Sequence, residues 1–327
     1  MFLKPMKLFA LDGSEVLGTS IAASLGSPLA AHEEREFEDG EHKVRPLEAV
    51  AGADVYVIHS LYGGPAQSAN DKLCRLLFFI GALKDAGAER VTAVTPYLCY
   101  ARKDQRTKSF DPVTTRYVAG MFEAVGTDAI VTLEVHNPAA FENAFRCRTV
   151  ALTAAPIFIE YVKSLAPNSL CVISPDTGGA KRAELFREAL EDTLGYSIGK
   201  AFMDKRRSAG TVSGDLFVGD ASGATALVID DLISSGTTLR RAAEAARRAG
   251  ARDVIALVAH GLFMEGSEGA VSHPAIGRLV TTDSVPPFRV KPGPMRDKVQ
   301  VLSCAPLLAE SIRRLHEDEP LSDLLVC

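Results

Sequence analysis

Residues 226–239 of this chain read ALVIDDLISSGTTL and contain the strongest local signal in the sequence. An apolar segment ends in two acids, Asp230 and Asp231, and a short loop of small hydroxyl residues and glycine follows. This order predicts a buried strand, a loop and the first turn of a helix. Because backbone N–H groups at a helix N-terminus bind phosphate, the stretch predicts a phosphate site. Such a site would lie at the carboxyl end of a parallel strand, where open α/β sheets bind ligands.

The two acids extend this predicted site beyond the phosphate. They stand where the hydroxyl groups of a sugar attached to the phosphate would lie. A helix cap without a ligand is the alternative interpretation, but ionised carboxylates at the end of a buried strand need partners. The candidate residues for binding a sugar phosphate are Asp230, Asp231, Ser234, Ser235, Gly236, Thr237 and Thr238.

Short apolar segments alternate with amphipathic segments along the rest of the chain. Strands are predicted at residues 54–59, 91–95, 129–133, 170–174, 226–229 and 254–259. Helices are predicted at residues 71–86, 112–125, 179–190, 237–249 and 306–316. The alternation favours an α/β fold with mostly parallel sheets flanked by helices. The charged and then small segment at residues 204–210 is predicted to be a loop that precedes a hairpin.

An internal similarity suggests how the chain divides into domains. Residues 52–95 and 223–259 both read as a strand, a loop, a helix and a second strand. We interpret them as parts of two domains with one fold, although any two βαβ units share this order. A chain of 327 residues suits two α/β domains. The predicted domains are residues 1–150 and 151–327.

The composition limits the classes of protein to which the chain can belong. With 47% hydrophobic and 24% charged residues, it is typical of soluble globular proteins. The net charge of −5 does not favour a nucleic-acid surface, and no apolar segment approaches the roughly 18 residues of a membrane helix. The six cysteines are scattered, without a C-x-x-C pair, and the N-terminus lacks a signal-peptide pattern. We therefore expect a cytoplasmic protein without nucleic-acid or membrane partners.

Several separate motifs resemble those of ribose-phosphate diphosphokinases, also called PRPP synthetases. The stretch at residues 226–239 resembles the phosphoribosyl-diphosphate loop of type I phosphoribosyltransferases. Other similar segments are residues 37–41 (FEDGE), 96–106 (PYLCYARKDQR), 133–136 (LEVH), 174–183 (SPDTGGAKRA) and 204–207 (DKRR). The resemblance extends over nearly the whole chain and implies two tandem type I phosphoribosyltransferase-like domains.

The resemblance also implies a reaction. Members of the family transfer the β,γ-diphosphoryl group of ATP to the C1 hydroxyl of ribose 5-phosphate, with Mg²⁺ as cofactor and AMP as the second product. We expect the N-terminal domain to bind ATP and to form the oligomer contacts. We expect the C-terminal domain to bind ribose 5-phosphate and to contain the catalytic loop. Homo-oligomers built from dimers, including hexamers, are typical of the family.

The resemblance assigns roles to individual residues of this chain. The ATP-binding residues would be Asp39, Gly40, Glu41, Arg102, Lys103 and His136, with the FEDGE segment near the adenine. Lys205 and Arg207 would be the catalytic cations that stabilise the transferred group. His136 and Asp176 would be the Mg²⁺ ligands.

The chain departs from the family pattern in its phosphate loop. Ser234 stands where the family has Asp, and Thr237 where it has a second Gly, although hydroxyl groups and Gly236 remain. A non-catalytic regulatory homologue and a phosphoribosyltransferase are therefore alternative functions. A regulatory homologue should have lost its catalytic cations or metal ligands, whereas the residues assigned to these roles are all present. A phosphoribosyltransferase typically has one such domain, and the complete N-terminal half argues against it.

Overall fold

The structure of the chain, a computed structural model, describes residues 4–208 and 211–325. These residues form two compact units. Unit 1 contains Met1–Thr153 together with Cys304–Cys327, and unit 2 contains Ala154–Ser303. Each unit is built around a sheet with helices against it, so the predicted α/β class is confirmed.

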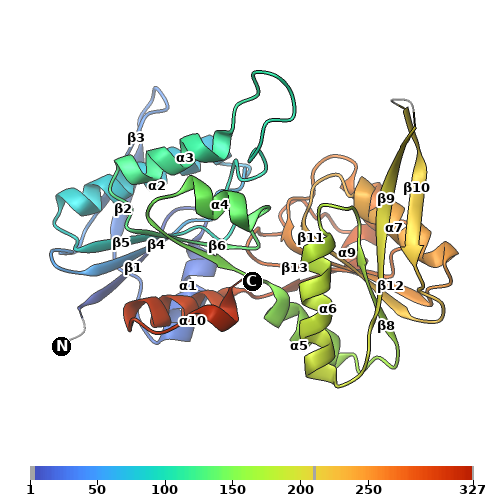
Figure 1. The fold of residues 1–327 in the computed structure, drawn as a ribbon. Helices are drawn as coiled ribbons and strands as arrows, with labels where there is room; N and C mark the ends of the chain where they lie inside the picture. Colours follow the sequence, from blue (N-terminus) through green and yellow to red (C-terminus); the bar gives the residue numbers. More distant parts are fainter. Residues whose placement is uncertain (1–3, 209–210, 326–327) are drawn as a thin grey trace. The chain divides into compact units, whose positions relative to one another are not determined.

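Unit 1 contains a five-stranded parallel sheet in the order β1-β4-β5-β6-β7. Its strands are β1 (Met6–Ala10), β4 (Asp54–Ile58), β5 (Arg90–Val94), β6 (Ala129–Leu133) and β7 (Arg148–Leu152). Its helices are α1 (Glu15–Leu25), α2 (Ala69–Asp85), α3 (Thr114–Ala124), α4 (Pro138–Ala144) and α10 (Ala305–His316), and η1 (Ser322–Leu324) follows α10. Helices α2 and α3 cover one face of the sheet, and α1 and α10 cover the other (Figure 1). A separate antiparallel hairpin consists of β2 (His32–Glu36) and β3 (His42–Pro46).

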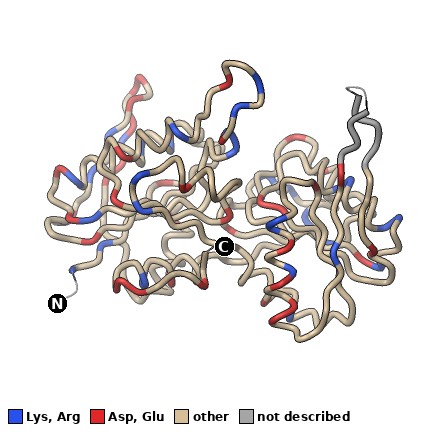
Figure 2. The backbone as a smooth tube through the Cα atoms, in the orientation of Figure 1, with Lys and Arg blue, Asp and Glu red and all other residues tan. Residues whose placement is uncertain are grey.

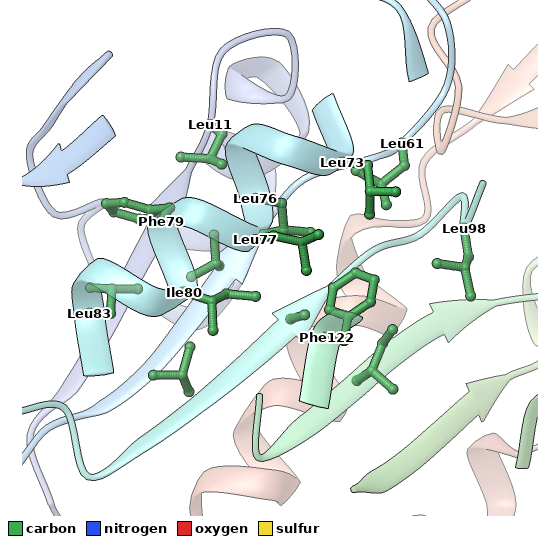
Figure 3. Packing of buried hydrophobic residues seen from close by; sticks show 14 of the residues in the cluster. Leu11, Leu61, Leu73, Leu76, Leu77, Phe79, Ile80, Leu83, Leu98 and Phe122 are labelled. Atoms are coloured by element: carbon green, nitrogen blue, oxygen red, sulfur yellow. The ribbon is translucent and has the colours of Figure 1, made fainter. Parts of the chain in front are cut away.

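The core of unit 1 forms where α2 packs on the sheet. Ser68 caps the helix, because its hydroxyl oxygen accepts a hydrogen bond from the Asp71 N–H and the Asp71 carboxylate accepts one from the Ser68 N–H. Leu76 and Ile80 follow at helical spacing and point into a dry cluster that also contains Phe122 (Figure 3). Burial of this stripe explains why the segment is helical. No described helix has both the length and the apolar composition to cross a membrane.

Unit 2 contains a seven-stranded sheet in the order β10-β9-β8-β11-β12-β13-β14. Its strands are β8 (Leu170–Ser174), β9 (Gly199–Ser208), β10 (Thr211–Gly219), β11 (Thr225–Ile233), β12 (Asp253–Gly261), β13 (Arg278–Thr282) and β14 (Val299–Leu302). Only β9 and β10 pair in the antiparallel sense among the described strands of this sheet. Its helices are α5 (Ala155–Ser164), α6 (Ala180–Leu194), α7 (Thr237–Arg248), α8 (Ser267–Val271) and α9 (Pro294–Lys298).

The two units repeat one topology. The order β1-β4-β5-β6-β7 in unit 1 corresponds to β8-β11-β12-β13-β14 in unit 2, and each unit has a hairpin between its first two parallel strands. The segments β4-α2-β5 and β11-α7-β12, which contain the similar sequences, occupy equivalent places in this order. The units differ in their hairpins, because β9 joins the sheet of unit 2 whereas β2 and β3 form a sheet of their own.

The division of the chain differs from the predicted domains 1–150 and 151–327 at its C-terminal end. Helix α10 packs against α1 and therefore belongs to unit 1. The Arg90 guanidinium donates to the carbonyl of Leu315 at 2.8 Å, and His316 Nδ1 lies 2.7 Å from Asp54 Oδ2. An amphipathic helix must bury its apolar face, but its sequence does not specify against which sheet.

The prediction of a loop at residues 204–210 is wrong for residues 204–208, because these residues lie in β9. Their backbone pairs with β10, with Lys205 opposite Asp215 and Arg207 opposite Val212. Strand pairing therefore overrides a charged composition that is typical of loops. Residues 209–210 lie outside the described part of the chain.

Replacing Ile312 in α10 by Ala tests the assignment of this helix to unit 1. Ile312 is fully buried, so Ile312→Ala should lower the free energy of unfolding by about 2–5 kcal/mol. Hydrogen exchange measured by mass spectrometry should show faster exchange in β1 and β4 but not in β8 and β11. Leu279→Ala, at an equally buried position in β13, is the matched control and should affect β8 and β11. Faster exchange of Ile312→Ala in unit 2 alone would contradict the assignment.

Candidate functional site

Unit 2 places the predicted sugar-phosphate residues at the carboxyl end of β11. The parallel pairing with β12 continues to Ile233, and the loop at residues 234–236 connects the strand to α7. Asp231 is buried, and its backbone N–H donates to Asp230 Oδ1 at 2.9 Å. The two acids are therefore fixed next to each other at the edge of the sheet, as the sequence predicts.

The loop before α7 depends on Gly236. This residue has a φ of 76°, and a Cβ atom at its position would lie 2.8 Å from Ala270 Cβ. Any other residue would be strained there and would also clash. Ser235 Oγ lies 3.2 Å from Thr237 Oγ1, and both Thr237 and Thr238 are exposed. The loop therefore presents hydroxyl groups beside the N-terminus of a 12-residue helix, an arrangement that suits an anion.

A second loop reaches this edge from β8, the neighbour of β11 in the sheet. Asp176 Oδ1 accepts a hydrogen bond from the Gly179 N–H at 3.0 Å, and the Ser174 hydroxyl donates to the Asp176 carbonyl at 2.6 Å. A Cβ atom on Gly179 would lie 2.9 Å from Ser174 Oγ. The close packing of this loop orients the Asp176 carboxylate, which is partly exposed and able to accept further contacts.

The two loops of unit 2 are joined by Arg182, a residue to which the sequence assigned no role. Its guanidinium, in the first turn of α6, lies 3.7 Å from Asp230 Oδ1. Burial and the neighbouring Asp231 carboxylate raise the pKa of Asp230 well above its ordinary value, although Arg182 acts in the opposite direction. Arg182 thus places a positive charge beside Asp230, at an edge where a ligand hydroxyl or a metal ion could also contact this carboxylate.

The predicted catalytic cations lie in the hairpin at the other side of β8. Lys205 and Arg207 belong to β9, which pairs with β8 along its first residues. The backbone of these two positions is described, but the side chains of residues 205–215 lie outside the described part. Their catalytic role therefore stays a prediction from the sequence.

In unit 1, the predicted ATP residue Lys103 already has an acidic partner. Lys103 Nζ lies 2.7 Å from Asp111 Oδ2 and 3.3 Å from Thr107 Oγ1. The Lys103 ammonium and the hydroxyl and N–H groups of the same loop hold the pKa of Asp111 far below its ordinary value. Arg102 is exposed and accessible to a ligand, whereas Lys103 is half-buried and paired with Asp111.

The structure brings the segment of His136 to the loop that contains Arg102 and Lys103. Both follow neighbouring strands, β6 and β5, at the carboxyl edge of the sheet. Asn137 links them, because its Nδ2 donates to Asp104 Oδ2 at 2.6 Å while its Oδ1 caps α4. His136 itself is exposed. Three of the six predicted ATP residues therefore come from adjacent loops of unit 1.

The other three, Asp39, Gly40 and Glu41, lie at the tip of the β2–β3 hairpin. All three are exposed, and the Glu41 N–H donates to Asp39 Oδ1 at 3.1 Å. Figure 2 shows acidic positions at this tip and basic positions along the loop that leads into α3. Within the described residues, no hydrogen bond or ion pair joins the tip to Arg102 or Lys103.

Comparison with known proteins agrees with this arrangement. A family model described as the N-terminal domain of ribose phosphate pyrophosphokinase matches residues 6–126, and one described as a phosphoribosyl synthetase-associated domain matches residues 212–326. A putative ribose-phosphate pyrophosphokinase 2 of Streptococcus pyogenes is 36% identical over 98% of this chain and 94% of that protein. A ribose-phosphate pyrophosphokinase of Clostridium tetani is 34% identical over 98% of this chain and 97% of that protein.

A solved structure extends the similarity to the fold. The crystal structure of phosphoribosylpyrophosphate synthetase from Mycobacterium smegmatis matches with a TM-score of 0.85 and 30% identity, covering 96% of this chain and 100% of that one. The fold and the acid-and-hydroxyl loop thus define a protein with two tandem type I phosphoribosyltransferase-like domains. The chain belongs to the ribose-phosphate pyrophosphokinase family.

Replacing Asp230 by Asn should raise the melting temperature of the ligand-free protein at pH 7–8 by about 2–4 °C. The pKa of Asp230 is raised in the folded state, so its ionisation opposes folding above the ordinary carboxyl pKa of about 3.9. The protonated Asp230 carboxyl stabilises the folded state relative to the ionised one. This contribution is fully present below that pH and is lost as the pH rises through the folded-state pKa. The difference between Asp230→Asn and wild type should therefore disappear near about pH 4.

Thermal unfolding over this pH range measures the effect of Asp230→Asn. Asp192→Asn, at an exposed position of α6, is the matched control and should change the melting temperature little at any pH. A melting temperature of Asp230→Asn below that of wild type at neutral pH would show that the ionised acid is compensated within the protein. That result would contradict the electrostatic description of the site.

Proposed function

We propose that this protein is a ribose-phosphate diphosphokinase. It transfers the β,γ-diphosphoryl group of ATP to the C1 hydroxyl of ribose 5-phosphate and forms 5-phosphoribosyl 1-diphosphate and AMP. The observation that supports this proposal most directly is the pair of acids, Asp230 and Asp231, beside the hydroxyl-rich N-terminus of α7. Membership of the pyrophosphokinase family supports the same reaction.

Ribose 5-phosphate would bind at the edge of the unit 2 sheet. Its phosphate would accept hydrogen bonds from the first N–H groups of α7 and from the hydroxyls of Ser235, Thr237 and Thr238. The ring hydroxyls would donate to Asp230 and Asp231. The neighbouring Asp231 carboxylate and burial raise the pKa of Asp230, so hydroxyl donors would stabilise the ionised form of Asp230.

ATP would use the residues of unit 1, with Arg102, Lys103 and His136 near its phosphates and the hairpin tip near its adenine. Asp176 fits Mg²⁺, because it supplies a carboxylate oxygen, the type of ligand that this cation prefers. His136 and Asp176 are the Mg²⁺ ligands that the family resemblance implies, and Mg²⁺ would neutralise negative charge on the phosphate oxygens. The release of Lys103 from Asp111 would provide a further cation for the nucleotide.

The reaction would be an in-line displacement at the β-phosphorus of ATP. A bond forms between the C1 oxygen and this phosphorus, and the C1 hydroxyl gives up its proton to solvent. The bond from the phosphorus to the α,β-bridging oxygen breaks to release AMP. The protein would position the two substrates and stabilise the charge on the transferred group. Lys205 and Arg207, in the β9–β10 hairpin, would supply the stabilising cations.

A non-catalytic regulatory homologue is the second candidate function. Two observations favour it: Ser234 replaces an acid of the family pattern, and Lys103 is neutralised by Asp111. Such a protein would bind the same ligands without turning them over, so the products distinguish the two candidates.

³¹P NMR of the purified protein with ATP, Mg²⁺ and ribose 5-phosphate tests the proposal. The expected result is the joint appearance of AMP and a sugar 1-diphosphate, and only when the sugar is present. Formation of ADP in place of AMP would contradict attack at the β-phosphorus. The absence of turnover would contradict the enzymatic function and favour the regulatory homologue.

Replacing Lys205 by Ala tests the proposed role of the β9–β10 hairpin. Loss of one cation from a closed site costs about 3–4 kcal/mol in the barrier, so kcat should fall roughly 10²–10³-fold while KM for ATP changes little. Lys200→Ala is the matched control, because Lys200 lies in the same strand and its Nζ is 2.9 Å from Glu184 Oε2. A Lys205→Ala variant that keeps most of its kcat would rule out this catalytic role.

A further inference from the structure

The β2–β3 hairpin is attached to unit 1 differently from its counterpart in unit 2. In unit 2, β9 pairs with β8 through backbone hydrogen bonds, so the sheet itself holds the β9–β10 hairpin. In unit 1, β2 and β3 pair with each other and form a separate sheet among the described strands. A two-stranded hairpin by itself is marginally stable in water. Side-chain contacts must therefore help to fix β2 and β3 to the rest of the unit.

Arg75 of α2 makes such contacts with β2. Its side chain is only 6% exposed; one terminal nitrogen lies 2.8 Å from Glu36 Oε2 and the other 3.5 Å from Glu34 Oε2. Glu34 and Glu36 are two residues apart and therefore share one face of the strand. A single guanidinium thus bridges two acids of the hairpin. The planar fork of arginine suits this geometry, whereas the compact ammonium of lysine does not.

Glu34 is the buried centre of this contact. Its side chain is 3% exposed, and its Oε1 accepts the Asp12 N–H at 2.6 Å and lies 3.1 Å from His32 Nε2. Burial alone would raise the pKa of Glu34, but the hydrogen bonds from His32 and the Asp12 N–H hold it below its ordinary value. A buried, ionised carboxylate needs a positively charged partner, and Arg75 supplies that charge.

The Arg75 contact lies directly below the tip of the hairpin. Glu36 pairs with His42, which is the last pair of the β2–β3 register before the turn. The His42 ring stacks on Phe78 of α2 with ring centroids 5.3 Å apart. Helix α2 therefore holds both ends of this last pair, and the tip at residues 37–41 starts immediately beyond it (Figure 1).

We propose that Arg75 is a positioning residue for ATP. By holding Glu34 and Glu36, Arg75 fixes the hairpin tip, which includes the predicted ATP residues 39–41. This inference rests on the proposed function, because it takes the tip as part of the ATP site. The tip would contact the adenine, which is remote from the reacting phosphorus. Loss of Arg75 should therefore weaken ATP binding more than it slows the turnover of bound ATP.

The variants Arg75→Met and Glu36→Gln test this role. Arg75→Met removes the charge at similar length, and Glu36→Gln removes only the outer ion pair at a side chain that is 65% exposed. Calorimetry with Mg²⁺ and ATP, without sugar, should show a rise in Kd of about tenfold or more for Arg75→Met and a smaller rise for Glu36→Gln. Hydrogen exchange should become faster at residues 37–46 and stay unchanged in β4 and β5, and kcat should change less than Kd.

Arg45→Met is the matched control. Arg45 Nε lies 2.5 Å from Glu33 Oε2 across the exposed face of the same hairpin, so its loss should change neither the ATP affinity nor the exchange of the tip. Unchanged ATP affinity, or unchanged hydrogen exchange at the tip, in both test variants would overturn the inference. The inference would also fail if Arg45→Met weakened ATP binding as much as Arg75→Met does. If the wild-type protein binds ATP but forms no AMP with ribose 5-phosphate, the proposed function fails while the ATP affinities still decide the role of Arg75. No ATP binding by the wild-type protein would overturn both.

Discussion

The parallel pairing of β8 with β11 is the constraint on which the proposed sugar-phosphate site depends. In this register Ile173 lies opposite Val228, so both strands leave the sheet at the same edge within a few residues. Asp176 follows the first strand, Asp230 lies near the carboxyl end of the second, and the phosphate loop follows that strand. A shift of one residue in β11 would turn each of its side chains to the opposite face. The register thus brings together acids and loops that lie more than 50 residues apart in the sequence.

The carboxyl edges of the two sheets have different side chains. In unit 2 this edge contains two adjacent acids and exposed hydroxyls. These groups can form hydrogen bonds with a sugar phosphate. In unit 1 the equivalent edge, after β4, is filled by the Lys72 side chain, which is 2% exposed. Its ammonium lies 3.4 Å from the centre of the Tyr62 ring and donates to the Ser60 carbonyl, and burial lowers its pKa to about 8. The segment after β4 thus contacts an internal cation of its own unit.

The sequence predicted the fold well where burial determines it. Central parallel strands such as β4 and the first half of β11 are apolar segments, and their helices have amphipathic spacing, so both were predicted within a few residues. The sequence missed β2, which reads HEERE, and the charged end of β9, because edge strands and hairpins take their stability from pairing rather than from an apolar pattern. The predicted domains also grouped α10 with residues 151–303, whereas this helix belongs to unit 1. Amphipathic spacing shows that a helix packs against a sheet but does not show which sheet.

The candidate site was predictable to a similar degree. The acids and hydroxyls around Gly236 belong to one short stretch, so their proximity follows from the sequence alone. The contact of Arg182 with Asp230 and the pairing of Lys103 with Asp111 depend on loop conformation and on the register of distant strands. Residue spacing contains no information on either. The position of Arg75 below the hairpin tip likewise became visible only in the folded unit.

A crystal structure of the protein with bound ribose 5-phosphate would test the central claim most directly. The phosphate should lie at the N-terminus of α7 and accept hydrogen bonds from the backbone N–H groups of residues 236–238. A ring hydroxyl should lie within hydrogen-bonding distance of Asp230 or Asp231. A phosphate bound elsewhere, or an empty loop at a saturating concentration of the sugar phosphate, would contradict the proposed site.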